Sequence, residues 1–470
     1  MDVAAIRAGL DHPVIDGDGH LLEYLPLLRD FIVEEAGEST AVRFDALLAP
    51  PPVRDTPVPE RRERRIDRNA WWGFPSENTL DRATATLPEL FYQRLDEFGI
   101  DYAVAYPTFG LFPDRVPDEE LRKAFARACN RYYAEVAFDH RDRFEPVAVI
   151  PMYTPDEALA ELDYAIRDRG FKAIVMSGVI LRPIPGANGA RGAVWIDTPG
   201  HDSPLDYDPV WQRCVDLGVA PTFHSLGSGW GTRTSSKNFV FNHVGHFATA
   251  QEAACRATVM GGVAQRFPEL RFSFLEGGVA WGANLCSDLI GHFEKRNIND
   301  VQLYDPSRLD RALYTELIEQ HGSTRVKAAA DRLEYALQLT PGGDPAPEEM
   351  DEFADAQVTE PDQIVELFSE RFFFGCEADD PMTAIAFDVT LPPVGRNLQP
   401  IFASDIGHFD VPDARGVLPE AWELVEHGQL DLDQFRQFMM TNAAKLWAGQ
   451  NPKFFEGTVV ADAIRSELGL

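Results

Sequence analysis

Short apolar runs recur along the chain and alternate with segments of helical periodicity. Each run ends in glycine, proline or a polar residue, and continuous apolar runs are typical of parallel strands covered on both faces. About eight runs are predicted to be strands: 14–15, 102–106, 144–150, 171–176, 219–223, 270–275, 372–374 and 400–403. Helical patterns lie between them, as in 118–138, 155–169 and 247–267. This alternation predicts a parallel sheet with helices packed against it.

About eight such units favour an α/β fold closed into a (β/α)8 TIM barrel; an open doubly wound sheet is the alternative. We expect a single domain over residues 1–470, with insertions at about 28–87 and 297–370, where the repeat is interrupted. The first insertion contains RRERR at 61–65. A solvated or ion-paired face is the preferred interpretation of this run, and a phosphate clamp is the alternative.

The amino-acid composition and net charge of the chain limit the kinds of partner that it is expected to bind. With 45% hydrophobic and 25% charged residues, the chain is globular, and its net charge of −32 argues against nucleic acids and anionic membranes. The N-terminus shows no signal-peptide pattern, and no apolar run reaches the roughly 20 residues that a membrane span needs. Five cysteines without a CxxC pair indicate reduced thiols. We therefore expect a cytoplasmic protein that acts on a small-molecule substrate.

Polar side chains with metal-binding chemistry follow the predicted strands. Asp18 and His20 follow the first strand, His224 the fifth, Glu276 the sixth and Asp405 the eighth. Barrel enzymes place their catalytic groups at the C-terminal ends of the strands, so these side chains are expected to meet at one mouth. Imidazole combined with carboxylate suits Zn, Fe or Mn.

Further histidines lie close to these positions. Asp18 and His20 are two residues apart, which puts both on one face of a strand. His243 and His246 are three apart at the start of a predicted helix, which would put both on one helical face. Metal binding and a packing or capping role both remain open for these two. His408 follows Asp405 by three residues and could orient a ligand or contact substrate as a catalytic group.

The segment VIDGDGHLLE at 14–23 resembles the N-terminal metal motif of the amidohydrolase-2 family, which includes aminocarboxymuconate semialdehyde decarboxylase and aromatic-acid decarboxylases. Many members have His-x-His there, and others have an acidic residue first, as Asp18 is here. His224 matches the single histidine after strand five, and 403–405 matches the Gly/Ala-Ser-Asp motif after strand eight. The resemblance covers nearly the whole chain and implies a metal-dependent TIM barrel.

One departure concerns Glu276. The decarboxylases usually have a catalytic histidine before Gly-Gly after strand six, whereas this chain has FLEGG. In this respect it resembles a branch of dinuclear non-haem oxygenases on the amidohydrolase barrel, which hold two irons or mixed manganese and iron. In that branch a carboxylate at the position of Glu276 can serve as a ligand.

These donors are compatible with two enzymatic activities and with a third hypothesis in which the chain is not catalytic. Asp18, His20, His224 and Asp405 suffice for one metal ion, and Glu276 with His243 or His246 brings the donors to about six, which suits two ions. The main expectation is a monooxygenase with two Fe, or Mn and Fe, that hydroxylates an apolar small molecule and uses an external electron donor.

The alternative is a hydrolase or decarboxylase with one Zn or Mn, acting on a small carboxylated or carbonyl substrate, with Glu276 or His408 as general acid or base. A non-catalytic metal-binding subunit is the third hypothesis, and the intact ligand set argues against it. Barrels of this kind commonly pair, so a homodimer is expected by analogy.

Overall fold

Eight parallel strands form the centre of the molecule. The computed structural model describes residues 1–48, 55–70, 73, 76–186, 193–337, 351–391 and 395–470. The strands follow one another around the sheet in the order β1-β2-β3-β4-β7-β8-β9-β10. Their bounds are β1 Ile15–Leu21, β2 Tyr102–Pro107, β3 Phe144–Ile150, β4 Ala173–Met176, β7 Pro221–Phe223, β8 Phe272–Phe274, β9 Phe372–Glu377 and β10 Gln399–Ala403. The predicted TIM barrel is confirmed, and every predicted strand overlaps an observed one.

The first and last strands meet at the site of barrel closure. Just beyond β10, Asp405 N donates to Asp18 O at 3.0 Å, and His20 N donates to Ile406 O at 2.9 Å. These two bonds connect β1 with the segment that follows β10, so the barrel is nearly closed at this mouth.

All eight barrel strands are buried, apart from the last residue of β9. β2 and β3 are buried along their whole length, as expected for strands covered on both faces. Phenylalanines from adjacent strands contact one another: the Phe223 and Phe274 rings stack with centroids 5.5 Å apart, and the Phe274 and Phe372 rings meet edge to face, also 5.5 Å apart. Phe223 and Phe274 also contact Trp211 and Trp281, which lie on two of the surrounding helices, so this packing joins the strands to those helices.

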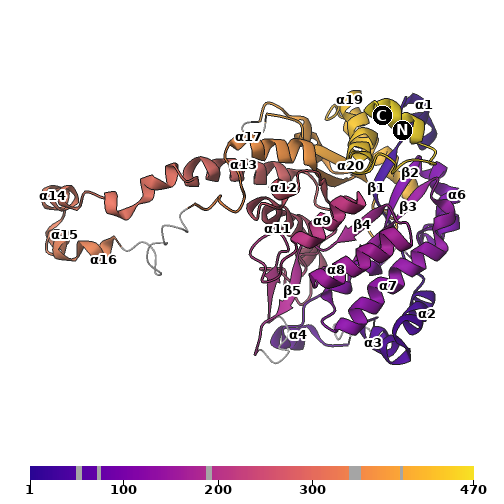
Figure 1. Ribbon diagram of the computed structural model, residues 1–470, viewed down its shortest axis with the longest axis horizontal. Helices are drawn as coiled ribbons and strands as arrows, with labels where there is room; N and C mark the ends of the chain where they lie inside the picture. The colour runs from indigo at the N-terminus through magenta and orange to yellow at the C-terminus, as the bar shows by residue number, and fades with distance from the viewer. Residues whose placement is uncertain (49–54, 71–72, 74–75, 187–192, 338–350, 392–394) are drawn as a thin grey trace.

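Helices surround the barrel (Figure 1). They include α7 Glu119–Val136, α8 Pro155–Leu162, α9 Asp208–Leu217, α11 His246–Met260, α12 Val263–Arg266, α13 Ala280–Arg296, α17 Pro361–Glu366, α18 Val417–Glu426, α19 Leu432–Arg436, α20 Asn442–Gln450 and α21 Ala461–Leu468. The residues that start a helix lie next to it in the sequence. For example, the Asp118 side chain caps the N-terminus of α7 by accepting a hydrogen bond from Leu121 N. The predicted helix at 247–267 is divided into α11 and α12, because Gly262 between them has φ +68°.

In the residues that the structure describes, the two segments predicted to be insertions consist of helices joined by turns and irregular stretches. The N-terminal α1 Val3–Gly9 precedes the first, which contains α2 Leu25–Ala36, α3 Glu38–Leu48, α4 Val58–Arg64 and α5 Thr79–Thr86; α6 Pro88–Phe98 then leads into β2. Parts of both segments, 49–54, 71–72, 74–75 and 338–350, lie outside the described residues. In the second segment, α14 Arg311–His321, α15 Thr324–Lys327 and α16 Leu333–Ala336 extend away from the barrel as an arm (Figure 1). Neither α14 nor α15 buries a residue.

Other features complete the fold. A two-stranded antiparallel hairpin, β5 Ile180–Pro183 and β6 Val194–Asp197, follows β4 and has no counterpart in the sequence predictions. All five cysteines are free thiols and buried, as expected. Among the described helices, none has the length and apolar character that crossing a bilayer requires.

Candidate metal centre

Six buried side chains from four strand ends meet at the C-terminal mouth of the barrel. Asp18 and His20 lie in β1, whose pairing with β2 shifts register between Asp16 and Gly19. The other four come from the loops that follow β7, β8 and β10: His224, Glu276, Asp405 and His408. The donor atoms form two overlapping groups, Asp18-His20-His224 and His20-Glu276-Asp405-His408, which share His20.

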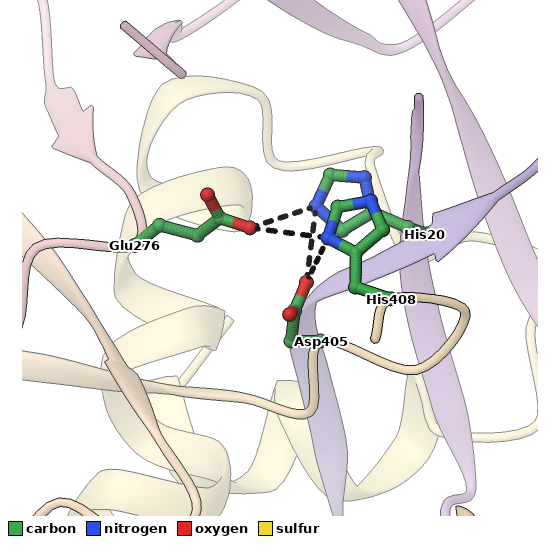
Figure 2. Close-up of side chains that lie close together, drawn as sticks. All are labelled: His20, Glu276, Asp405 and His408. Carbon is green, nitrogen blue, oxygen red and sulfur yellow. Dashed lines mark ion pairs between the residues drawn. The ribbon is translucent and has the colours of Figure 1, made fainter. Parts of the chain in front are cut away.

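His20 Nε2 is at the centre of the cluster. Asp18 Oδ1 and Glu276 Oε1 each lie 3.5 Å from it, and Asp405 Oδ1 lies 3.6 Å away. His224 Nε2 approaches to 3.2 Å. Figure 2 shows Glu276 reaching in from the side opposite the His20 and His408 rings, while Asp405 points between them.

The cluster has the features expected of a site for a cation. Neither carboxylate oxygen of Asp18 accepts a hydrogen bond from the residues that the structure describes, although both are buried. A buried carboxylate without donors is costly unless a cation neutralises it. Donor atoms bound to one ion at about 2.0–2.2 Å lie roughly 3–3.6 Å from one another, and the separations around His20 Nε2 are 3.2 to 3.6 Å. The residues present therefore fit a divalent metal ion.

The pKa values of the clustered side chains also favour a bound cation. Burial, together with the neighbouring His408, lowers the pKa of His20 to about 3, so this imidazole is neutral and keeps a lone pair for a metal. Burial lowers the pKa of His224, but the carboxylate of Glu276 outweighs it and raises the pKa to about 9. Burial and the charge of Glu276 raise the pKa of Asp405 well above its usual value. The metal-free cluster thus contains carboxylates that repel one another.

His408 lies within the cluster. Its Nδ1 is 2.5 Å from Asp405 Oδ1 and 3.4 Å from Glu276 Oε1. Its ring stacks on His20 with centroids 3.8 Å apart, and its Nε2 lies 3.2 Å from Thr108 Oγ1. The side chain can therefore ligate a metal, or it can exchange a proton with Glu276.

A buried carboxylate absent from the sequence predictions supports the cluster. Asp16 accepts from Ser404 N at 3.0 Å, from Ser404 Oγ at 2.6 Å and from Asp18 N at 3.2 Å. It therefore ties the segment carrying Asp405 to the strand carrying Asp18. The available signal was the repeated Asp-Gly in DGDGH, together with the serine that precedes Asp405.

Two members of the cluster have an unusual backbone conformation. Glu276 has φ +53° and Asp405 has φ +50°, in the left-handed region that non-glycine residues seldom adopt. Such conformations cost energy and concentrate at functional sites, where the surrounding structure holds them. Here they accompany the sharp turns after β8 and β10.

His243 and His246 lie outside both donor groups. The prediction that they share one helical face was wrong: α10 Phe239–His243 ends at the first, and α11 begins at the second. Gly245 between them has φ +70°, which breaks the helix. His243 Nδ1 lies 2.8 Å from Ala70 O, whereas both ring nitrogens of the buried His246 lack hydrogen-bond partners among the described residues.

Comparisons with known proteins agree with this geometry. A family model described as "Amidohydrolase" matches residues 15–360. An amidohydrolase from Mycobacterium avium subsp. paratuberculosis K-10 is similar in structure, with 17% identity and a TM-score of 0.53, over 93% of this chain and 100% of that chain. A dihydroxybenzoic acid decarboxylase from Polaromonas sp. JS666, solved with manganese and 2-nitroresorcinol, has 14% identity and a TM-score of 0.52, over 95% and 99% of the two chains.

A third structure, 2,6-dihydroxybenzoate decarboxylase from Rhizobium, has 14% identity and a TM-score of 0.50, over 93% and 98% of the two chains. At these identities the structural likeness shows a shared fold. The family match covers most of the chain and includes the strand ends that carry Asp18, His20, His224 and Glu276. The chain belongs to the amidohydrolase family.

Proposed function

We propose that the chain is a decarboxylase that depends on one divalent metal ion, manganese or zinc, and acts on a small carboxylic acid. The convergence of buried imidazole and carboxylate donors around His20 Nε2 carries this proposal. Family membership and the fold shared with two dihydroxybenzoate decarboxylases support it. Of the two activities expected from the sequence, this is the alternative to the oxygenase.

Four side chains would hold the ion: Asp18, His20, His224 and Asp405. Four ligands leave two positions open for substrate on a six-coordinate manganese ion, whereas a zinc ion must expand its tetrahedral coordination to bind substrate. A bound ion supplies a Lewis acid that polarises a carboxylate or carbonyl oxygen. The imidazole of His20 is suited to ligate the ion, because burial lowers its pKa and keeps the ring neutral.

Glu276 and His408 remain for proton transfer. Loss of CO2 requires a proton at the carbon that loses the carboxylate, so the site must hold one close by. Glu276 Oε1 and His408 Nδ1 are 3.4 Å apart and can share that proton. The ring of His408 is fixed by its stacking on His20 and by its contact with Thr108, which keeps Nδ1 directed at the cluster.

The dinuclear iron monooxygenase gains no support from the family match or from the structural neighbours. Its motivation was the surplus of donors, but His243 and His246 lie outside the donor groups. The two groups that exist share His20, so they form one cluster. Under the proposed reaction no external electron donor is needed.

Metal content and gas exchange test the proposal. Protein purified from cells grown with iron, manganese and zinc should contain one manganese or zinc per chain. It should release CO2 from a member of a panel of small aromatic acids without consuming O2. Two irons per chain with O2 uptake would overturn the proposal in favour of oxidation. Cleavage of an ester or amide panel without CO2 release would replace decarboxylation by hydrolysis.

Substitution of Glu276 tests its role. Glu276→Gln keeps the shape of the side chain but cannot accept the proton, so kcat should fall by about 10²–10⁴ while the metal content is unchanged. Elemental analysis and turnover on the same sample measure both. Glu269→Gln is the matched control, because Glu269 is an exposed carboxylate that precedes β8, whereas Glu276 follows it, and it lies outside the donor groups. Loss of metal from Glu276→Gln would instead make Glu276 a ligand.

A further inference from the structure

A positively charged side chain lies beside the metal centre without an acidic partner. Arg115 ends the short 3-10 helix Pro113–Arg115 that follows β2. The two residues before it, Pro113 and Asp114, line a small cavity of about 20 Å³ together with His224. The segment that carries Arg115 therefore borders the barrel mouth next to a predicted metal ligand.

Among the described residues, Arg115 makes one side-chain hydrogen bond, from Nη2 to Leu226 O at 2.7 Å. None of the carboxylates that the structure describes comes within ion-pair distance of it, although the chain has 75 acidic and 43 basic residues. Nearby Arg122, by contrast, pairs with Glu157. Burial lowers the pKa of Arg115 to about 10, which still leaves the guanidinium charged at neutral pH. Most of its N–H donors therefore have no partner among the residues that the structure describes and can serve a ligand.

His246 is a second side chain of this region whose hydrogen-bonding atoms lack partners among the described residues. Its side chain is 2% exposed, and neither ring nitrogen has a hydrogen-bond partner among the described residues. A buried imidazole without partners is costly, which indicates that something outside the protein satisfies it.

The segment after His224 connects these two groups. Leu226 accepts the hydrogen bond from Arg115. Its neighbour Gly227 lies so close to His246 that an added Cβ would be 2.4 Å from the His246 carbonyl oxygen. On the side of the metal centre, the Phe247 ring lies 3.9 Å from the His246 ring and 5.8 Å from the His224 ring, between centroids. The segment that follows His224 therefore connects the surroundings of Arg115 and His246 to the metal centre.

We propose that Arg115 and His246 form an anion subsite that binds a second carboxylate of the substrate, which makes the substrate a dicarboxylic acid. One carboxylate occupies the metal centre and reacts, and the other accepts paired N–H donors from Arg115 and one N–H from His246. Guanidinium binds carboxylate through two parallel hydrogen bonds, which fixes the orientation of the ring or chain between the two groups. This inference rests on the proposed function for the identity of the reacting group.

Binding to the metal-loaded enzyme tests the subsite without requiring turnover. The probes are isophthalate, with two carboxylates, and benzoate, with one, measured by isothermal titration calorimetry. Wild-type protein should bind isophthalate at least tenfold more tightly than benzoate. Arg115→Met should remove that preference while benzoate affinity and metal content stay unchanged. Arg256→Met is the matched control and should keep the preference, because Arg256 is exposed on α11, the helix that begins at His246, and pairs with Glu252.

Two further variants cover the case in which Arg115→Met does not fold. Arg115→Lys keeps the charge but cannot bind in the paired mode, so isophthalate should bind about tenfold more weakly. His246→Phe keeps the ring volume and removes the N–H, and should weaken isophthalate alone.

Equal affinity for isophthalate in wild type and in the folded Arg115 and His246 variants would overturn the inference. Its failure is distinct from failure of the proposed function, which is decided by metal content and CO2 release. An Arg115-dependent preference in an enzyme that releases no CO2 would preserve the subsite and reject the decarboxylase.

Discussion

Two glycines in DGDGH set how closely the strands at the barrel closure approach each other. A Cβ added at Gly17 would lie 2.2 Å from Ile401 Cγ2 in β10, and one at Gly19 would lie 2.4 Å from Asp16 Oδ2. The missing side chains let β1 approach β10 and leave room for the Asp16 bonds to Ser404. Residues with no chemistry of their own therefore position the ligands on either side of them.

Gly17→Ala should destabilise the protein by about 1–3 kcal/mol, because the added methyl group overpacks the closure. Gly291→Ala is the matched control: no atom lies within 4 Å of its added Cβ, and it lies inside α13. That variant should gain about 0.5–1 kcal/mol from the lower backbone entropy of the unfolded chain. Urea unfolding of both measures the difference, and equal stability of the two variants would contradict the packing argument.

Among the helices, a buried ion pair connects α7 to α8. Arg122 Nε and Nη2 donate to the two oxygens of Glu157 at 2.7 and 2.6 Å, and Nη1 donates to Val116 O at 2.7 Å. Both side chains of the pair are 2% exposed. Every charge in this arrangement has a partner, so it holds two helices in one relative position on the outside of the barrel.

Arg122→Met should cost about 3–5 kcal/mol in the free energy of unfolding, because it leaves the Glu157 carboxylate buried without its partner. The adjacent Lys123 supplies the control, since its pair with Glu119 on the same helix is exposed. Lys123→Met should cost no more than about 0.5 kcal/mol. Chemical denaturation of the two variants gives the comparison; a small loss for Arg122→Met would mean that water or a rearranged helix compensates for the pair.

For the whole molecule, the metal centre concentrates negative charge in a chain whose net charge is already −32. The clustered carboxylates of Asp18, Glu276 and Asp405 are buried, so solvent screens their repulsion little. A bound cation should therefore stabilise the folded barrel as a whole, since the ligands come from the first and last strands and from the loops after β7 and β8.

Chelation should lower the Tm of the metal-loaded protein. A ligand present at about 100 times its Kd stabilises the folded state by about 2.7 kcal/mol, and removing it forfeits that amount. Differential scanning calorimetry with and without EDTA measures the shift. Asp18→Asn, which removes one ligand charge, should melt at nearly the same temperature with or without the chelator. If the Tm of the wild-type protein did not change when EDTA is added, the metal would make no contribution to the stability of the fold.

Much of the barrel could be predicted from local pattern. Apolar runs such as 144–150 identify strands because both faces are buried, and a carboxylate or imidazole at a strand end, as at Asp18 and His224, identifies the functional mouth. Asp405 was identified in the same way, at the end of the eighth predicted strand, and the family motif at 403–405 agrees with it. These features can be read from the sequence because the type of each residue reflects whether its position is buried or ends a strand.

Other features depend on contacts between distant segments. The stacking of His408 on His20, the hydrogen bonds from Ser404 to Asp16, and the position of Arg115 beside Leu226 all depend on the assembled barrel. The sequence by itself thus determined which residue types end the strands. Only the tertiary structure decided which of them share one site, because barrel closure brings together side chains hundreds of residues apart and no local pattern encodes their distances.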